Sequence, residues 1–436
     1  MTAPTVTLEA MTIQLRPTSS QIVYLRFDRD DPDHALPVGE LRIPWSRSTP
    51  WSHAEPQQWQ LQLLLAPDAV EWPHIRLDVE VIVRADVRIL EHDGSTRVQE
   101  VRLASGWISS IEQSPLRSDG RYAVMLTLDD LMTRAAGDII GDSPWPRQSI
   151  AARLQRINEL TSRPYVTVSS GFYVAARDID AQPALDVIQS CCRFGWIVAP
   201  DADGTRLAIQ QLPPRGPTDP VIVPPSIIED TGRAIDRSSY ITELGLTAFW
   251  ALADSEAGTP STRTFKATTT IPVRSRTTLS NDIEWHSATD WPDRIRVWAF
   301  AILAAAAREV PRLPGSPRLV LSKPVPVPNI DRLLAEFGRH TEVLAIPDSP
   351  GNLDEQHSIL GGEITITGRK IQISLTLAPG NNAGLRNMRW TDVGRPLWVD
   401  PWGGTNYPFT FDQLSWEQYP DWTWADTRYY SGIPRI

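Results

Sequence analysis

The chain up to residue 128 places an apolar side chain at about every second position, and this alternation constrains the fold more than any other feature. It is plain in the segments QIVYLRF, QWQLQLLL, LDVEVIVRADVRIL, GWISSIEQ and RYAVMLTL. Successive side chains of a strand point to opposite faces, so a period of two indicates half-buried strands. Asp93 and Gly94 stand between two of these segments and suit a tight hairpin turn. The spacing of the strands predicts a β-sandwich or a β-barrel.

The period changes near residue 149, where a helix is expected. Ser149 can cap this helix, and Arg153 and Arg156 are expected to face away from its apolar side. That apolar side consists of Ile150, Leu154 and Ile157. A second helix is expected over 184–194, and it leads into a hairpin with its turn at 201–204. Helix and hairpin together predict a small α/β unit.

The second half of the chain returns to a similar order of elements. Strand-like segments occur in SYITELGLTAFW and TRTFKATTTIPVRS. The longest helix is expected from Asp290 to just before Pro311, and a shorter one from its cap Asn329 to its stop Gly338. The alternating segment GEITITGRKIQISLTLAPG then predicts a hairpin that turns at Gly368. No sequence repeat is strong enough to demonstrate a duplication of one module.

The segment 381–436 is rich in tryptophan and tyrosine. Aromatic side chains at this density are expected to be buried against their own chain or against a partner, because large exposed apolar patches mark interaction sites. The candidate interface residues are Trp398, Trp402, Trp416, Trp422, Trp424, Tyr429 and Tyr430. A contact surface is the expected role, and a glycan-binding face is the alternative.

Charge and hydropathy exclude several classes of protein. The net charge is −10 and the pI is about 5.3, which argues against a nucleic-acid binder because clustered Lys and Arg supply most of the affinity for phosphates. The start, MTAPTVTLEAMTIQLRP, lacks the basic and apolar regions of a secretory signal. The longest apolar run, VWAFAILAAAA, is shorter than the roughly 18 to 20 residues that span a bilayer, so no membrane anchor is expected.

No catalytic residue, cofactor-binding residue or metal ligand is expected from the motifs. The histidines lack the spacing of a zinc enzyme, and GDIIGDS lacks the lysine of a phosphate-binding loop. FDRDDPDH could hold Ca²⁺, but the Gly and Glu of a calcium loop are missing, so a solvated acidic loop is favoured. Cys191 and Cys192 are expected to be buried and inert. Paired catalytic carboxylates and a tryptophan-lined sugar cleft stay open, because sequence does not show their geometry.

Three stretches resemble the tail-hub family of tailed bacteriophages, the minor tail or baseplate hub proteins of the long-tailed, non-contractile type. The first is GWISSIEQSPLRSDGRYAVMLTLDDLMTRAAGD. The second runs from SPWPRQSIAARLQRI through ALDVIQSCCRFGWIVAPDADGTRLAI, and the third is SILGGEITITGRKIQISLTLAPG. The resemblance spans about residues 40–380 and rests on the order of the three stretches.

The resemblance implies a structural virion protein and not an enzyme. It implies a homotrimer at the distal tail tip, in which two barrels per chain form a pseudo-sixfold ring that joins the sixfold tail tube to threefold tip proteins and lets DNA pass. The implied partners are the distal tail or tail-tube protein and the tip or receptor-binding proteins of the same virion, with passing DNA only transient and no cofactor. Such a protein is made in the host cytoplasm and resides in the virion. An excess of acidic residues would then help DNA to pass through the ring without binding, because negative charges repel its phosphates.

Two alternatives to a hub remain at this stage. One is a tail-associated glycan-binding or receptor-binding module, with the aromatic segment as its binding face. The other is a cell-wall hydrolase, for which the residues at 381–436 are few for an independent domain.

The expected fold class is β-rich α+β, with two β-barrel-like domains, α/β insertions and an aromatic-rich C-terminal extension. The expected domains are 1–39 (N-terminal strands or arm), 40–135 (first β-barrel), 136–235 (α/β), 236–279 with 356–380 (second β-barrel), 280–355 (inserted α/β) and 381–436 (aromatic-rich extension).

Overall fold

The computed structural model describes most of the chain up to residue 379. The described residues are 5–18, 20–28, 38–48, 52–141, 143–163, 165–166, 172–201, 204–211, 221–229, 241–251, 259–266, 276–286, 299, 303, 318–335, 343–346 and 355–379. Within them the fold is β-rich with few helices, and strand pairing in its two largest sheets is mainly antiparallel.

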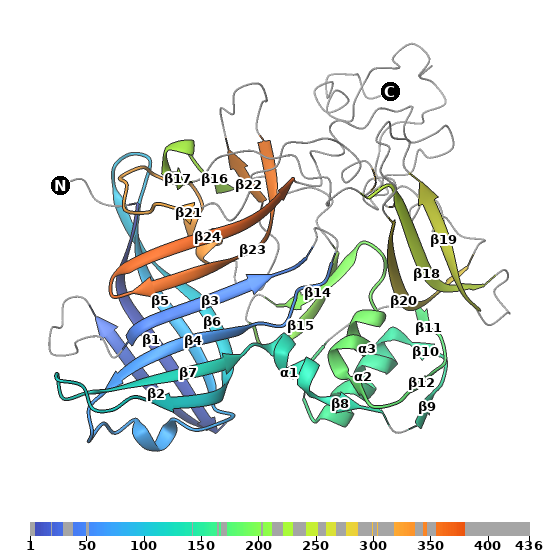
Figure 1. The fold of residues 1–436 in the computed structure, drawn as a ribbon, viewed down its shortest axis with the longest axis horizontal. Helices are drawn as coiled ribbons and strands as arrows, with labels where there is room; N and C mark the ends of the chain where they lie inside the picture. Colours follow the sequence, from blue (N-terminus) through green and yellow to red (C-terminus); the bar gives the residue numbers. More distant parts are fainter. Residues whose placement is uncertain are drawn as a thin grey trace, which may run out of the picture.

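A 13-stranded sheet forms one lobe of the molecule, called the sheet lobe here (Figure 1). Its N-terminal strands are β1 (Val6–Thr18), β2 (Gln21–Asp28), β3 (Val38–Ser46), β4 (Gln58–Leu65), β5 (Glu80–Leu90), β6 (Thr96–Gln113) and β7 (Tyr122–Asp129). Its later strands are β16 (Val221–Ile222), β17 (Ile228–Glu229), β21 (Arg318–Leu319), β22 (Val343–Ile346), β23 (Glu355–Thr367) and β24 (Lys370–Pro379). The order is β17-β21-β24-β23-β3-β4-β7-β6-β5-β1-β2, and β22 joins β16 to β23.

The alternation in the sequence explains the two faces of this sheet. On β4, Trp59, Leu61 and Leu63 are fully buried, while Gln58 and Gln60, which alternate with them, are exposed. The inward side chains of β1, β5, β6 and β7 join the same apolar core, so the predicted strands are confirmed. The predicted turn at Gly94 is confirmed as well, with a φ of 83° that favours glycine.

The last hairpin pairs with the N-terminal strands. Thr367 faces Lys370 across its turn, and β23 pairs with β3 from Gly361–Ser46 to Thr367–Glu40. Gly361 makes this approach possible, because a Cβ there would overlap the Trp45 carbonyl and lie 2.7 Å from Ser46 Cα. The last hairpin therefore completes the sheet that the first strands begin.

This pairing differs from the expectation that residues 236–279 and 356–380 share one barrel. The strands β18 (Glu243–Ala251), β19 (Thr259–Lys266) and β20 (Arg276–His286) belong to a separate five-stranded sheet, in the order β10-β11-β20-β18-β19. Apolar residues of β18 pack into the core of that second lobe. Alternation shows which face of a strand is apolar, but it does not show which strand lies beside it.

The large sheet curls so that its first strand meets the segment after β21. Thr5 is fully buried, and its backbone N donates to the Leu321 carbonyl at 3.0 Å. Its hydroxyl donates to the Val325 carbonyl at 2.6 Å. The helix α5 (Ile330–Leu334) follows this segment and packs into the same core. One continuous core thus joins the two ends of the described chain.

Over the described ranges, the second lobe, called the α/β lobe here, holds three helices with defined bounds over its own core (Figure 1). The helices are α1 (Leu131–Gly137), α2 (Ile150–Thr161) and α3 (Ala184–Ser190). Its short strands are β8 (Ile139–Ile140), β9 (Ser143–Trp145), β10 (Gln148–Ser149), β11 (Tyr173–Val174), β12 (Arg177–Ile179), β13 (Gln182–Pro183), β14 (Trp196–Pro200) and β15 (Leu207–Gln211). The single-turn 3₁₀ helices η2 (Trp72–His74) and η3 (Pro225–Ile227) lie in the sheet lobe.

The helix ends test the capping predictions. Ser149 caps α2 as predicted, because its side chain accepts a hydrogen bond from Ala152 N at 3.2 Å. α3 ends at Ser190, so the helix is shorter than the predicted 184–194. Asn329 precedes α5, but it is not the predicted side-chain cap, because it adopts a left-handed φ of 60° and makes no capping hydrogen bond. The stop predicted at Gly338 lies outside the described residues.

The longest predicted helix, from Asp290 to Pro311, lies almost wholly outside the described residues. Of this segment Ala299 and Leu303 are described, and both are helical and buried in the α/β core.

Candidate functional site

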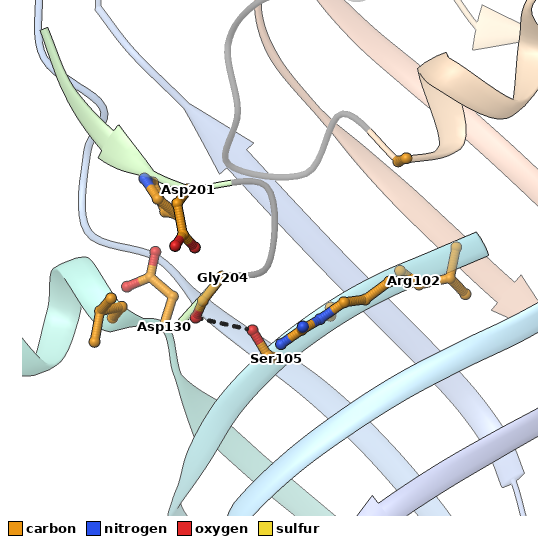
Figure 2. Close-up of a pocket in the computed structure, with 10 residues that line it drawn as sticks. Arg102, Ser105, Asp130, Asp201 and Gly204 are labelled. Carbon is orange, nitrogen blue, oxygen red and sulfur yellow. Dashed lines mark hydrogen bonds between the residues drawn. The ribbon is translucent and has the colours of Figure 1, made fainter. Parts of the chain in front are cut away.

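The two lobes meet around a small cavity (Figure 2). Its walls come from β6, the start of α1, the β14–β15 turn and the residue after α5. The lining residues are Arg102, Leu103, Ala104, Ser105, Asp130, Leu131, Pro200, Asp201, Gly204 and Ala335. The cavity holds about 20 Å³, which is the room of a single water molecule.

Asp130 joins the sheet to the first helix of the α/β lobe. It follows the last residue of β7 and caps α1, because its carboxylate accepts a hydrogen bond from Thr133 N at 2.6 Å. Its own backbone N donates to the Gln57 carbonyl at 3.1 Å. Burial raises the pKa of Asp130 to about 6, because desolvation disfavours the charged form. The carboxyl group is thus a buried part of the joint.

Asp201 and Gly204 shape the β14–β15 turn that docks on β6. Asp201 accepts hydrogen bonds from Thr205 N at 2.9 Å and from Arg206 N at 3.3 Å. Gly204 has a φ of 59°, and a Cβ there would overlap the hydroxyl of Ser105. That hydroxyl donates to the Gly204 carbonyl at 3.2 Å. The predicted turn at 201–204 is confirmed, and its glycine permits the close contact between the lobes.

His53 makes a second polar link between the lobes. The imidazole Nδ1 accepts a hydrogen bond from Val198 N at 3.1 Å, and Ala54 N donates to the Val198 carbonyl at 3.1 Å. Burial lowers the pKa of His53 to about 4, because desolvation disfavours the imidazolium. A protonated Nδ1 cannot accept a hydrogen bond, so the link requires the neutral ring.

This junction has the chemistry of a structural joint. Both of its carboxylates accept hydrogen bonds from backbone N–H groups, and the cavity between them is too small for a substrate. Across the part of the chain that the structure describes, no three His, Cys, Asp or Glu side chains come together as metal ligands.

A buried charge cluster lies in the core of the α/β lobe and corrects one prediction. Arg153 was predicted to face away from the apolar side of its helix, but it is fully buried. Its position is three residues after Ile150 and four before Ile157, which places it on the same helical face. The guanidinium donates to the Ala175 carbonyl at 2.8 Å and lies 3.7 Å from the carboxylate of Asp282. Backbone acceptors for Nη2 and the nearby carboxylate thus compensate its burial in part, while Nε and Nη1 are buried without a hydrogen-bond partner among the described residues.

Arg156, the second arginine predicted to face away from the core, and the two cysteines lie in the same lobe. Arg156 is half-buried and lies over the Trp145 ring at 4.5 Å. Cys191 and Cys192 are buried and free, as predicted. Burial raises the pKa of Cys191 to about 12 and that of Cys192 well above its usual value, so neither thiol forms a reactive thiolate near neutral pH.

A row of polar side chains crosses the outward face of the sheet lobe. The strand pairing aligns one residue from each of β24, β23, β3, β4, β7 and β6 in a cross-strand row, called the polar row here. Its members are Gln372, Thr365, Arg42, Gln60, Thr127 and Ser110. Arg42 is its one charged residue, and an ion pair with Glu40 at 2.6 Å balances that charge.

The outward face of β5 and β6 has a different character. Arg84 lies opposite Arg102, and Asp86 lies opposite Glu100. Arg84 also forms an ion pair with Glu100 at 2.8 Å. The β14–β15 turn covers part of this face at Ser105, so the charged face contributes to the junction between the lobes.

The predicted aromatic interface residues, Trp398 to Tyr430, lie outside the described residues. Two polar residues of the junction, Asp130 and His53, are not among the residues predicted from the sequence. Asp130 stands directly before the helical segment LMTRAAG, so an N-cap signal could have found it. His53 lies in an irregular segment and has no such local signal, because its partner is distant in sequence.

Within the described ranges, no helix combines the length and the apolar character needed to span a membrane.

Comparison with known proteins finds similar solved structures. The 43 kDa tail protein of prophage MuSo2 from Shewanella oneidensis has 11% identity and a TM-score of 0.47, over 86% of this chain and 98% of that one. A tail protein from Neisseria meningitidis MC58 has 10% identity and a TM-score of 0.47, over 86% and 99%. The prophage tail protein gp18 from Listeria monocytogenes EGD-e has 10% identity and a TM-score of 0.44, over 83% and 94%. No protein-family model and no curated protein matches the sequence.

Proposed function

We propose that this chain is a structural protein of a bacteriophage tail and forms the hub at the distal tip. The proposal starts from the three stretches that resemble tail hubs. The first stretch forms the end of β6, β7 and α1, the second includes α2, α3 and the β14–β15 hairpin, and the third forms most of the β23–β24 hairpin. The observation that carries the proposal is the pairing of β23 with β3, because it makes one scaffold from the first and the third stretch.

The proposed assembly is a homotrimer. Each chain would contribute two β-units, so a trimer would present six similar units to the sixfold tail tube. The same trimer has threefold symmetry, which matches the threefold tip proteins. The strand pairing favours the 13-stranded and five-stranded sheets as these two units, rather than the boundaries expected from the sequence. The proposed partners are the distal tail or tail-tube protein and the tip or receptor-binding proteins of the same virion, with DNA in transit through the ring. A symmetric ring requires surfaces that fit a second copy of the chain.

The native mass of the full chain tests this proposal. A trimer would have three times the chain mass of 48.7 kDa. Native mass spectrometry over a range of protein concentrations should show this species, and its share should increase with concentration. A chain that stays monomeric at all concentrations contradicts the ring.

The aromatic residues of the segment 381–436 are proposed to form contacts within this assembly. Replacing Trp416 and Trp422 together by serine should lower the fraction of trimer in the full-length chain, because interfaces depend on buried aromatic anchors. Tyr24 on β2 is 59% exposed and offers a matched control, Tyr24→Ser. If the double variant keeps the trimer but loses binding to cell-wall glycan, the glycan-binding alternative replaces the contact role.

A further inference from the structure

We infer that the segment between β3 and β4 is a latch on the α/β lobe that opens in acid, because protonation of His53 removes the acceptor for Val198 N. The segment, called the strap here, consists of residues 52–57 and directly precedes β4. It belongs to the sheet lobe by its place in the chain, but Ala54 is 3% exposed and packs into the core of the α/β lobe. This inference does not depend on the proposed hub function.

The strap occupies one edge of β14. On its other edge β14 pairs with β15, where Val198 lies opposite Ile209, and among the described strands β14 has no other partner. His53 Nδ1 accepts a hydrogen bond from Val198 N, and Ala54 N donates to the Val198 carbonyl, both at 3.1 Å. Both backbone groups of Val198 therefore point away from β15. The strap satisfies the two groups that a further strand would otherwise bind.

Only the neutral imidazole can hold this contact. In the neutral ring one nitrogen accepts a hydrogen bond and the other donates, whereas both nitrogens donate once the ring is protonated. A protonated Nδ1 would meet the Val198 N–H donor to donor and would place a charge beside the apolar strand WIVAP. Desolvation lowers the pKa of His53 to about 4, which agrees with this geometry.

The charged groups around the strap have partners of their own. β14 and β15 contain no titratable residue. Glu55, the other titratable residue of the strap, accepts a hydrogen bond from the Ser46 hydroxyl at 2.6 Å. Next to β3 and α1, the charged residues and their partners are Arg47 with the Ile359 carbonyl, Asp130 with Thr133 N and Arg134 with Asp78. Desolvation is the one cause of the lowered pKa of His53, so none of these groups compensates a charge on the ring.

The other contacts of the strap do not depend on the protonation of His53. Glu55 N donates to the Ser46 carbonyl at 2.9 Å. The Gln57 carbonyl accepts from Asp130 N at 3.1 Å and from the Thr133 hydroxyl at 2.8 Å. Acid therefore releases residues 53 and 54 from β14, while residues 55–57 stay bound to β3 and α1. The opening is local and leaves the core of the sheet lobe intact.

Hydrogen exchange of the full chain, followed by mass spectrometry from pH 7 to pH 4, tests the latch. The readout is the protection factor of peptides that contain Val198, each compared with the exchange rate of an unstructured peptide at the same pH. An opening linked to a pKa change from 6.5 to about 4 should lower this protection factor by about 100-fold at pH 4. Peptides from β4 report on the sheet lobe core and should stay protected over the same range.

Two variants separate His53 from the other titratable group of the strap. His53→Asn keeps an acceptor for Val198 N but does not titrate, so its protection factor at Val198 should stay constant from pH 7 to pH 4. Glu55→Gln is the matched control and should lose protection as the wild type does. A wild-type protection factor that stays constant would overturn the inference, and so would an equal loss in His53→Asn. A parallel loss of protection in β4 would also overturn it, because the chain would then unfold as a whole instead of opening at the strap.

Discussion

Replacing Asp130 by asparagine should remove a pH dependence that the buried carboxyl group gives to the joint between the lobes. The pKa of Asp130 is raised from 3.8 to about 6. The folded chain therefore holds more protons than the unfolded chain between these two values. The free energy of unfolding falls as the pH rises through this window. The loss is complete above about pH 6.

The size of the effect follows from the shift. A difference of about two pH units, at about 1.4 kcal/mol each, gives a penalty of about 3 kcal/mol above pH 6. Asparagine has nearly the same shape as the protonated carboxyl group and offers Thr133 N a neutral acceptor, whereas the stronger hydrogen bond of the carboxylate is already contained in the net pKa shift. We therefore expect Asp130→Asn to be more stable than the wild type by about 3 kcal/mol at pH 8. Below pH 4 this advantage should disappear.

Urea unfolding followed by tryptophan fluorescence, repeated from pH 4 to pH 8, measures this difference. Asp129→Asn is the matched control, because it removes the same charge one position earlier, where the side chain is only half-buried and accepts from Gln58 Nε2 at 2.8 Å. Parallel curves for the wild type and Asp130→Asn would refute the reasoning, since burial of the carboxyl would then add no pH dependence to stability.

Two further substitutions test the contacts that connect distant parts of the chain. Gly361→Ala should lower the free energy of unfolding by about 1–3 kcal/mol, because its Cβ would force β23 away from the Trp45 carbonyl. Gly137→Ala is the control, because no atom lies within 4 Å of its added Cβ. This control should be nearly neutral in the same urea titration. Equal effects of the two alanines would contradict the close pairing of β23 with β3. His53→Asn keeps an acceptor for Val198 N but removes the titrating ring, whose pKa is lowered from 6.5 to about 4. The wild type should therefore lose up to about 3 kcal/mol relative to this variant as the pH falls from 6.5 to 4, and an unchanged difference across that range would count against the link.

His53 and Asp130 act in opposite directions on the same joint. Acidification from pH 6 to pH 4 weakens the fold through His53 and strengthens it through Asp130, so the wild type should show less pH dependence than either single variant. Sequence reasoning could not anticipate this balance, because both shifts come from desolvation by residues that are far away along the chain.

Local sequence signals predicted many of the elements and their ends. The alternation in β4 and β5, the turn at Gly94 and the cap Ser149 depend on neighbours within a few residues, so they can be read from a short window. The predicted burial of Cys191 and Cys192 was also correct, since apolar residues precede them in the same helical segment.

The amino-acid sequence by itself determined the alternating strands of the N-terminal segment, the last hairpin, the helix that Ser149 caps and the turns at Gly94 and 201–204. Only the tertiary structure decided that β23 lies beside β3, that β18–β20 form a separate sheet, and that Arg153 has buried acceptors. Periodicity shows which side of a strand or helix is apolar, because it depends on neighbours within a few residues. Strand pairing and burial depend on contacts between segments that are far apart along the chain, and a short stretch of sequence does not show which segments meet.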